Sequence, residues 1–269
     1  MKTTIRNGTV VTAEKTVEAD ILIEGGLIAA IGPALEAEAD QIIDAAGKYV
    51  LPGGVDAHVH LDLPMFGTVS SDDHYTGGKA AAFGGTTTLI DFISQDEGTL
   101  NENIDRWHAK AEKSCIDIGA HMNITHWDNH IRQQLAHLPQ RGITSIKVFT
   151  AYNNRLRLND GDIYKAMRMA GTHGILTLVH AENGDVIDVL VAEALAKNRT
   201  QPIWHARTRP AWGEVEASLR AVALGAQAGA PVYLVHMNVA GEVDQLGYGR
   251  SKGVKVMGET CPQYLFFSE

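Results

Sequence analysis

The sequence predicts an α/β fold in which a parallel sheet, open or closed into a barrel, follows a small β-rich region. Residues 1–50 read as short strands separated by turns. From about residue 53 onward, short apolar runs rich in β-branched residues alternate with segments of helical period. Repeated β-α units of this kind are typical of parallel sheets, because parallel strands need a crossover connection.

The first region carries the turn signals of a small β-subdomain. Asn7-Gly8 is a turn signal inside the first apolar run, and Gly25-Gly26 closes a predicted hairpin over residues 20–32. Residues 41–50 supply a further strand pair. Because so few residues bury little apolar surface by themselves, we expect residues 1–52 to need a partner.

Residues 53–269 contain seven predicted strands, and the chain ends just after the seventh. The helical segments between them predict two apolar faces, one formed by Ile104, Trp107 and Ala111. The other is formed by Val215, Leu219 and Val222. The strands are predicted at residues 55–59, 86–92, 117–125, 144–149, 175–180, 231–236 and 254–258.

Composition narrows the class of protein. The chain has 269 residues, 45% of them hydrophobic and 20% charged, which suits one large core or one large and one small domain. Its net charge of -9 is dispersed and argues against a nucleic-acid partner. Cys115 and Cys261 lie far apart, as expected in a reducing compartment. No apolar run could span a bilayer and no signal peptide is apparent, so we expect a cytoplasmic protein without a membrane partner.

Histidines gather where the predicted strands end. His58 and His60 follow the first run and, two residues apart on an extended strand, point to the same side. His180 and His236 end two later runs. Barrel active sites are built at these strand ends, and neutral imidazoles bind zinc and similar ions. The histidines therefore predict a metal site, although His58 and His60 alone could equally lie on a solvated strand end.

Lys147 stands inside the apolar run 144–149, where a lysine needs an explanation. It could pair with an acid such as Glu182 or Glu259. Alternatively, loss of solvent lowers its pKa, so that the neutral amine is available for chemistry. A neutral lysine can add carbon dioxide and form a carbamate, whose two oxygens can bridge two cations.

Five motifs stand out along the chain, at residues 53–60, 83–88, 147–152, 180–184 and 258–265. Together, and in this order, they resemble the dihydropyrimidinase/D-hydantoinase family, the cyclic amidases of the amidohydrolase superfamily. The resemblance implies a TIM-like (β/α)8 barrel over residues 53–269. It also implies that residues 1–52 form the N-terminal part of a β-sandwich subdomain, and that the protein is a homo-oligomer, either a tetramer or a dimer.

The resemblance also implies a reaction and its residues. It implies two divalent ions, usually zinc, bridged by N6-carboxylated Lys147, with Tyr152 supporting the oxyanion. The expected activity is hydrolytic ring opening of hydantoins and 5,6-dihydropyrimidines to N-carbamoyl amino acids, because a hydroxide that bridges two cations is a nucleophile at neutral pH. The implied metal ligands are His58, His60, Lys147, His180 and His236.

One departure from the family concerns the end of the chain. The family takes a further metal-binding aspartate, which is also its proton shuttle, from an eighth strand, and the sequence ends at Glu269 without one. We therefore expect a fragment or a truncated product with an open barrel seam, which would aggregate or capture a partner. A catalytically inactive truncated or scaffold homologue is the corresponding alternative, and a scaffold would bind no metal.

Two loops are expected to determine which ring substrate the site binds. Leu61-Asp62-Leu63 stands where dihydroorotase relatives usually carry an arginine, which disfavours that activity, and disfavours allantoinase activity less strongly. The apolar loop from Leu63 to Phe66 and the loop from Asn153 to Leu156 match the family's specificity loops. They predict a pocket for an apolar 5-substituent of a hydantoin, with Leu63, Phe66, Asn153 and Leu156 as its substrate-binding residues.

Overall fold

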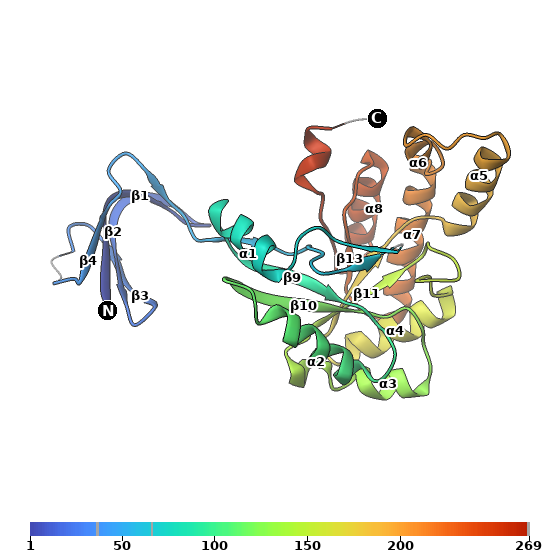
Figure 1. Ribbon diagram of the computed structural model, residues 1–269, viewed down its shortest axis with the longest axis horizontal. Coiled ribbons are helices and arrows are strands. Elements are labelled where there is room, and N and C mark those ends of the chain that lie inside the picture. The colour runs from blue at the N-terminus through green and yellow to red at the C-terminus, as the bar shows by residue number, and fades with distance from the viewer. Residues whose placement is uncertain (36–37, 66, 268–269) are drawn as a thin grey trace. The chain divides into compact units, whose positions relative to one another are not determined.

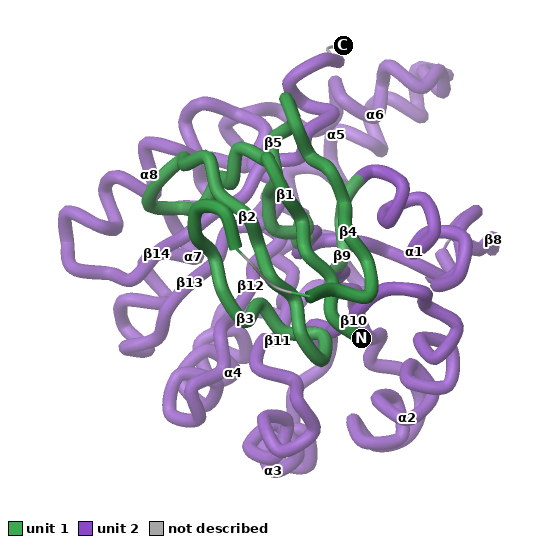
Figure 2. The backbone as a smooth tube through the Cα atoms, turned by 90° about the vertical axis from the view of Figure 1, so that its left-hand side faces the viewer, with its two compact units in different colours: residues 1–55, 85–87 green, residues 56–84, 88–269 purple. Residues whose placement is uncertain are grey.

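The computed structural model describes residues 1–35, 38–65 and 67–267, which form two compact units (Figures 1 and 2). The first unit comprises Met1–Val55 with Gly85–Thr87, and the second comprises Asp56–Gly84 with Thr88–Glu269. The proposed domain division after residue 52 lies close to this boundary and stays a prediction.

The first unit is built on a strand that pairs with three others. Strands β3, β2, β1 and β4 form a sheet in that order, and β5 pairs with β1 beyond β4. The predicted hairpin at Gly25-Gly26 is confirmed, because it joins β2 to β3. Both β4 and β5 run parallel to β1. The strands are β1 Lys2–Val11, β2 Thr16–Glu24, β3 Leu27–Gly32, β4 Gln41–Asp44 and β5 Tyr49–Val50.

The turn expected at Asn7-Gly8 is wrong. Strand β1 continues through these residues, and its pairing with β2 shifts register between Ile5 and Gly8. Asn7 takes a left-handed φ of 61°, and its backbone N–H donates to Asp20 Oδ1 at 3.0 Å. These residues therefore form a β-bulge within the strand instead of a turn. Pairing on both sides keeps the strand extended.

A seven-stranded sheet organises the rest of the chain. Its order is β14-β13-β12-β11-β10-β9-β6, and the neighbours from β9 to β14 are parallel. All seven predicted strands are therefore confirmed, in sequence order across the sheet. Their bounds are β6 Gly54–Asp56, β9 Thr86–Ile93, β10 Asp117–Asn123, β11 Ser145–Phe149, β12 Leu176–His180, β13 Val232–Leu234 and β14 Val256–Gly258.

Helices follow the strands and cover the outer side of the curled sheet (Figures 1 and 2). A short ribbon of β7 (Pro64–Met65) and β8 (Thr68–Val69) precedes the first helix. The described helices include none long and apolar enough to cross a membrane. Their bounds are α1 His74–Phe83, α2 Leu100–Ala111, α3 Asn129–Leu135, α4 Asp160–Thr172, α5 Gly184–Ala196, α6 Ile203–Arg207, α7 Ala211–Ala228 and α8 Ala240–Ser251, with 3-10 turns at Leu138–Arg141 and Pro262–Leu265.

The main core lies between the sheet and this helical layer, and both predicted helix faces contribute to it, the second only in part. Ile104, Trp107 and Ala111 are buried on α2, which confirms that face. On α7 the prediction is confirmed at Val222, which is buried, and wrong at Leu219, which is 41% exposed. The buried side of α7 carries small residues instead, since the helix lies close to β13 and to its neighbouring helices. They include Ala217, Ser218, Ala221 and Gly225.

The close packing of α7 predicts opposite effects for two glycine substitutions. A methyl group at Gly225 would lie 2.1 Å from Cγ2 of the buried Val232, whereas one at Gly247 on α8 would meet nothing within 4 Å. We expect Gly225→Ala to lower the free energy of unfolding by about 1–3 kcal/mol. Gly247→Ala should raise it by up to about 1 kcal/mol through helix propensity. Urea unfolding measures both, and equal effects would contradict the packing described.

Candidate active site

Five side chains, carried by or following four strands of the sheet, lie close together. Lys147 lies in the middle of β11, and His180 is the last residue of β12. His236 follows β13 by two residues, while His58 and His60 follow β6. Because parallel strands end at one edge of the sheet, the topology brings together the residues that the sequence singled out.

The distances show how closely these groups gather. Lys147 Nζ lies 3.4 Å from His58 Nε2, and His180 Nδ1 lies 2.9 Å from His236 Nε2. The ring of His58 is 5.2 Å from that of His60 and 5.4 Å from that of His236, measured between centroids. The four imidazoles and the amine thus surround one small space.

Two carboxylates hold the outer nitrogens of these rings. His58 Nδ1 donates to Glu259 Oε1, and His180 Nε2 donates to Glu182 Oε2 at 2.6 Å. Each ring therefore keeps its other nitrogen directed at the centre, as metal-binding histidines generally do. The sequence did not predict this role for either glutamate. The available signal was position, because Glu182 follows His180 by two residues and Glu259 directly follows β14.

Burial favours the neutral forms of His60, His180, His236 and Lys147. Loss of solvent lowers the pKa of His60 to about 3 and that of His236 to about 2, helped by the charge of Lys147. Burial likewise lowers the pKa of His180. The pKa of Lys147, whose residue is 2% exposed, falls from 10.5 to about 7, mainly for the same reason. Near neutral pH the centre therefore offers imidazole lone pairs and a substantial fraction of free amine.

Lys147 forms no ion pair in the part of the chain that the structure describes. Glu182 and Glu259, the acids considered as its partners, bond to His180 and His58 instead. The amine lies 4.3 Å from the centroid of the Phe92 ring. Its surroundings are therefore aromatic and imidazole groups, which explains the lowered pKa.

The arrangement of these side chains can be compared with the ligands that a divalent metal ion requires. Among the described residues, no three His, Cys, Asp or Glu side chains are arranged to hold one ion. The centre instead offers two imidazole pairs, His58 with His60 and His180 with His236, and the amine of Lys147 next to His58. Such pairs fit a divalent ion only if a further donor, available at Lys147, completes each set.

Tyr152 lies beside this centre on the loop after β11. Its ring centroid is 5.0 Å from that of His180, and its backbone φ is 64°, a left-handed value that a tyrosine rarely adopts. His236 shares this feature, with a φ of 41°. Burial and the Glu182 carboxylate raise the pKa of Tyr152, so its hydroxyl keeps its proton and remains a donor.

A pocket of about 380 Å³ opens onto the centre. Leu63 and Leu156 line it, together with Pro64 and Met65. Asn153 turns away, because its amide donates to Asp185 Oδ1 and Asp188 Oδ2 on α5 at 3.0 and 2.8 Å. Phe66, the remaining residue predicted for this pocket, lies outside the described residues. Also lining the pocket are His60, Ser94, Asn123, Lys147, Phe149, Tyr152, Arg155, His180 and His236.

Similar proteins show the family to which the chain belongs. No protein-family model matches the sequence. A D-hydantoinase from Streptomyces coelicolor is 47% identical over 274 residues, or 99% of this chain and 59% of the relative. Dihydropyrimidinase 1 of Caenorhabditis elegans is 38% identical over 95% of this chain and 54% of the relative. The chain belongs to the D-hydantoinase/dihydropyrimidinase family.

The structural comparison agrees with this membership. A crystal structure of a D-hydantoinase matches with a TM-score of 0.97 at 48% identity, covering 100% of this chain and 59% of the other. The dihydropyrimidinase from Brevibacillus agri matches equally well, at 49% identity over the same shares. The predicted TIM-like barrel fold is thereby confirmed. This chain spans about three-fifths of the length of these hydantoinase relatives.

A buried carboxylate supports the segment that carries His58 and His60. Asp91 on β9 is 1% exposed, and its Oδ2 accepts hydrogen bonds from His74 Nε2 and Trp107 Nε1, each at 2.9 Å. Its Oδ1 accepts from the backbone N–H groups of Phe92 at 2.7 Å and Leu61 at 3.4 Å. Asp91 thus ties α1, α2 and the residue after His60 to one strand.

We expect Asp91→Asn to lower the free energy of unfolding by about 1–3 kcal/mol. An amide places an NH₂ group against donors that now share a carboxylate, so buried hydrogen bonds go unmade. Asp117→Asn, at the exposed start of β10, should change stability by less than about 0.5 kcal/mol. Urea unfolding of both variants checks this, and an equally harmless Asp91→Asn would show that the carboxylate charge is dispensable.

A second carboxylate pair lies between α7 and α8. Glu214 is 9% exposed and Glu242 is 2% exposed. Ser218 Oγ donates to Glu242 Oε1 at 2.8 Å, and Asn238 Nδ2 donates to Glu214 Oε1 at 3.3 Å. Burial, followed by the charge and hydrogen bond of Glu242, raises the pKa of Glu214 from 4.5 to about 8.

This raised pKa predicts that stability falls with pH. Folded Glu214 keeps its proton up to about pH 8, whereas the unfolded chain releases it near pH 4.5, so the folded state binds more protons between these values. Within that interval, the free energy of unfolding falls by at most about 1.4 kcal/mol for each pH unit as pH rises. Glu214→Gln should flatten this slope in urea unfolding between pH 5 and pH 8. Glu216→Gln, exposed on the same helix, should leave it unchanged.

Proposed function

We propose that the site hydrolyses the ring amide of hydantoins or 5,6-dihydropyrimidines, giving N-carbamoyl amino acids. One observation carries the proposal, namely four imidazoles gathered around a lysine whose pKa burial lowers to about 7. The approximately 380 Å³ pocket beside them suits a small ring compound. The family membership supports the same reaction class.

The chain's own residues would hold two divalent ions, with zinc as the expected metal. His58 and His60 would serve one ion and His180 and His236 the other, with Lys147, carboxylated at its amine, serving both. Bound there, the ions would lower the pKa of water and polarise a carbonyl group. Glu259 and Glu182 would orient His58 and His180, because each accepts the proton of the ring nitrogen that faces away from the centre.

The remaining roles fall to the loop after β11 and to the pocket. In the hydrolysis, water oxygen bonds to the carbonyl carbon, the ring C–N bond breaks, and the departing nitrogen takes a proton. Negative charge develops on the carbonyl oxygen, and the protonated hydroxyl of Tyr152 can donate to it. Leu63 and Leu156 would contact the ring substituent, because both line the pocket.

A cytoplasmic location and a homo-oligomer, dimer or tetramer, also stay predictions from the sequence.

Lys147→Ala tests the proposal. We expect the zinc-loaded protein to bind about two ions per chain and to open dihydrouracil or a 5-aryl hydantoin, followed by the loss of ultraviolet absorbance. Lys147→Ala should lower metal affinity and activity by at least about a hundredfold, since a shared ligand is lost. Lys165→Ala, exposed on α4, should change neither.

Other outcomes would contradict the proposal. A protein that binds metal fully without Lys147 would exclude the bridging role. A protein that binds no metal at all would match an inactive scaffold homologue. Turnover restricted to dihydroorotate would assign a dihydroorotase-type reaction instead.

A further inference from the structure

A buried histidine of β10 contacts the backbone just before His58. His121 Nε2 lies 3.0 Å from the carbonyl oxygen of Ala57, and His121 Nδ1 contacts Ser145 Oγ on β11. Both His121 and Ser145 are buried. Because a carbonyl oxygen can only accept a hydrogen bond, the ring proton is on Nε2. Nδ1 then accepts from the Ser145 hydroxyl, and this donor fixes the tautomer that holds the Ala57 carbonyl.

The strand that leads into His58 has little other support. β6 is three residues long, all three are exposed, and it lies at the end of the sheet order next to β9. A segment with few buried contacts opens easily. The hydrogen bond from His121 therefore anchors the segment after β6 to β10, a strand that is not its neighbour in the sheet.

Backbone contacts hold the residues on both sides of His58. Val59 N–H donates to the carbonyl of Ile90 on β9 at 3.2 Å, and the Ala57 carbonyl accepts from β10. The carbonyl of Ala57 and the nitrogen of His58 belong to one planar peptide group. A hydrogen bond to that carbonyl therefore fixes the plane from which the His58 side chain starts.

Packing contributes to the same arrangement and can be separated from the hydrogen bond. The ring of Phe92 lies 4.8 Å from that of His121 and 4.6 Å from that of His58, between centroids. A phenylalanine in place of His121 would keep a flat ring against Phe92. It would leave the Ala57 carbonyl without its donor, which makes it the informative substitution.

We propose that His121 is a positioning residue for the metal ion that His58 and His60 would hold. Through the Ala57 carbonyl, His121 sets the peptide plane before His58 and thereby the direction of its ring. The proposal rests on the proposed function, which places an ion there. The second ion should depend on His121 much less, because its histidines follow or end other strands, β12 and β13.

Zinc affinity tests the assignment without any measurement of turnover. Competition with a chromogenic chelator resolves the two ions per chain. We expect His121→Phe to weaken one ion by about tenfold and the other by less than about twofold, as for lost support around a metal ligand. His121→Gln, whose amide N–H can reach the position of Nε2, should restore most of the affinity. Ser145→Ala should weaken the same ion by a smaller factor, because the tautomer is no longer fixed.

Double variants identify the weakened ion. In protein that carries His58→Ala, the site near His121 is already lost, so His121→Phe should have no further effect on zinc affinity. In protein that carries His180→Ala, the remaining ion should show the full loss. Equal weakening of both ions by His121→Phe would overturn the assignment. If His121→Phe does not fold, unchanged zinc affinity in Ser145→Ala would overturn it as well.

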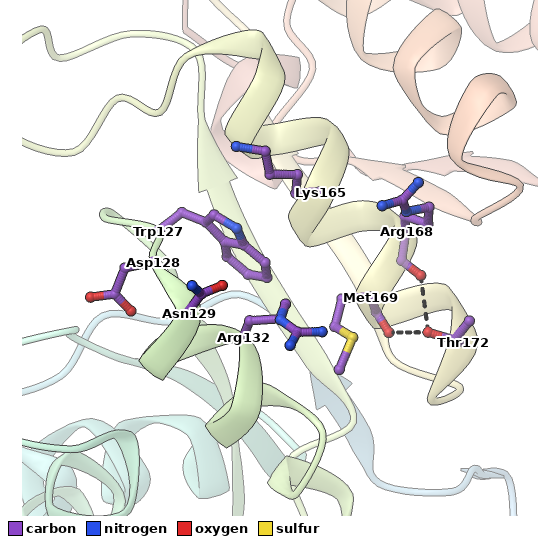
Figure 3. A pocket seen from close by; sticks show the side chains of 8 residues that line it. All are labelled: Trp127, Asp128, Asn129, Arg132, Lys165, Arg168, Met169 and Thr172. Carbon is purple, nitrogen blue, oxygen red and sulfur yellow. Dashed lines mark hydrogen bonds between the residues drawn. The ribbon is translucent and has the colours of Figure 1, made fainter.

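Met169 supplies a matched control for lost stability. It lines a hollow of about 650 Å³ between α3 and α4 with Trp127, Arg132 and neighbouring residues, and none of the described residues there is one of the five central side chains (Figure 3). Met169 packs against the main core, so Met169→Ala should lower the free energy of unfolding. It should leave both zinc affinities unchanged. Similar zinc losses in Met169→Ala and His121→Phe would show general destabilisation and contradict the assignment.

Failure of the proposed function can be told apart from failure of this assignment. If the protein binds no zinc, the proposed function fails, and hydrogen exchange of the metal-free protein decides on His121 alone. Exchange of the Val59 N–H should be about tenfold faster in His121→Phe, because the segment opens more often. His121→Gln should restore it, and Met169→Ala should leave it nearly unchanged. Unchanged exchange in His121→Phe would overturn the positioning role.

Discussion

Loss of solvent around Lys147 is the constraint on which the rest of the site depends. The lysine lies in the central part of a parallel sheet, where all five residues of its strand are buried. A charged amine is costly there, and the described part of the chain gives it no carboxylate partner. The neutral form is favoured instead, and with it the neutral forms of the imidazoles nearby. The same burial that shapes the core therefore leaves imidazole and amine lone pairs available at the centre.

The acids of the site lie behind the histidines and Lys147. Glu259 and Glu182 contact the outer nitrogens of His58 and His180, and Asp91 bonds to the backbone just after His60. Each carboxylate accepts hydrogen bonds that orient a ring or a loop. Carboxylates in direct contact with the amine would instead hold its proton. The arrangement separates orientation, which needs charge, from the centre, which needs free lone pairs.

Contacts with α5 hold the loop after β11 in place beside the pocket. The loop after β11 combines left-handed backbone at Tyr152 and Asn154 with side-chain bonds from Asn153 and Arg157 to α5. Strain of this kind persists only where the surrounding structure holds it. The result is a tyrosine next to His180 and an arginine at the pocket wall, both supplied by one short segment.

The sequence by itself determined the positions of the seven parallel strands, the helix face of α2 and the gathering of His58, His60, Lys147, His180 and His236. These follow from local periodicity and from the rule that parallel strands end at one edge. Only the tertiary structure decided that Asn7-Gly8 forms a bulge, that Leu219 is exposed, and that Asn153 faces α5. It also decided the partners of Glu182, Glu259 and Asp91. Pairing across strands, close approach of helices and hydrogen bonds between distant residues depend on contacts that no local pattern records.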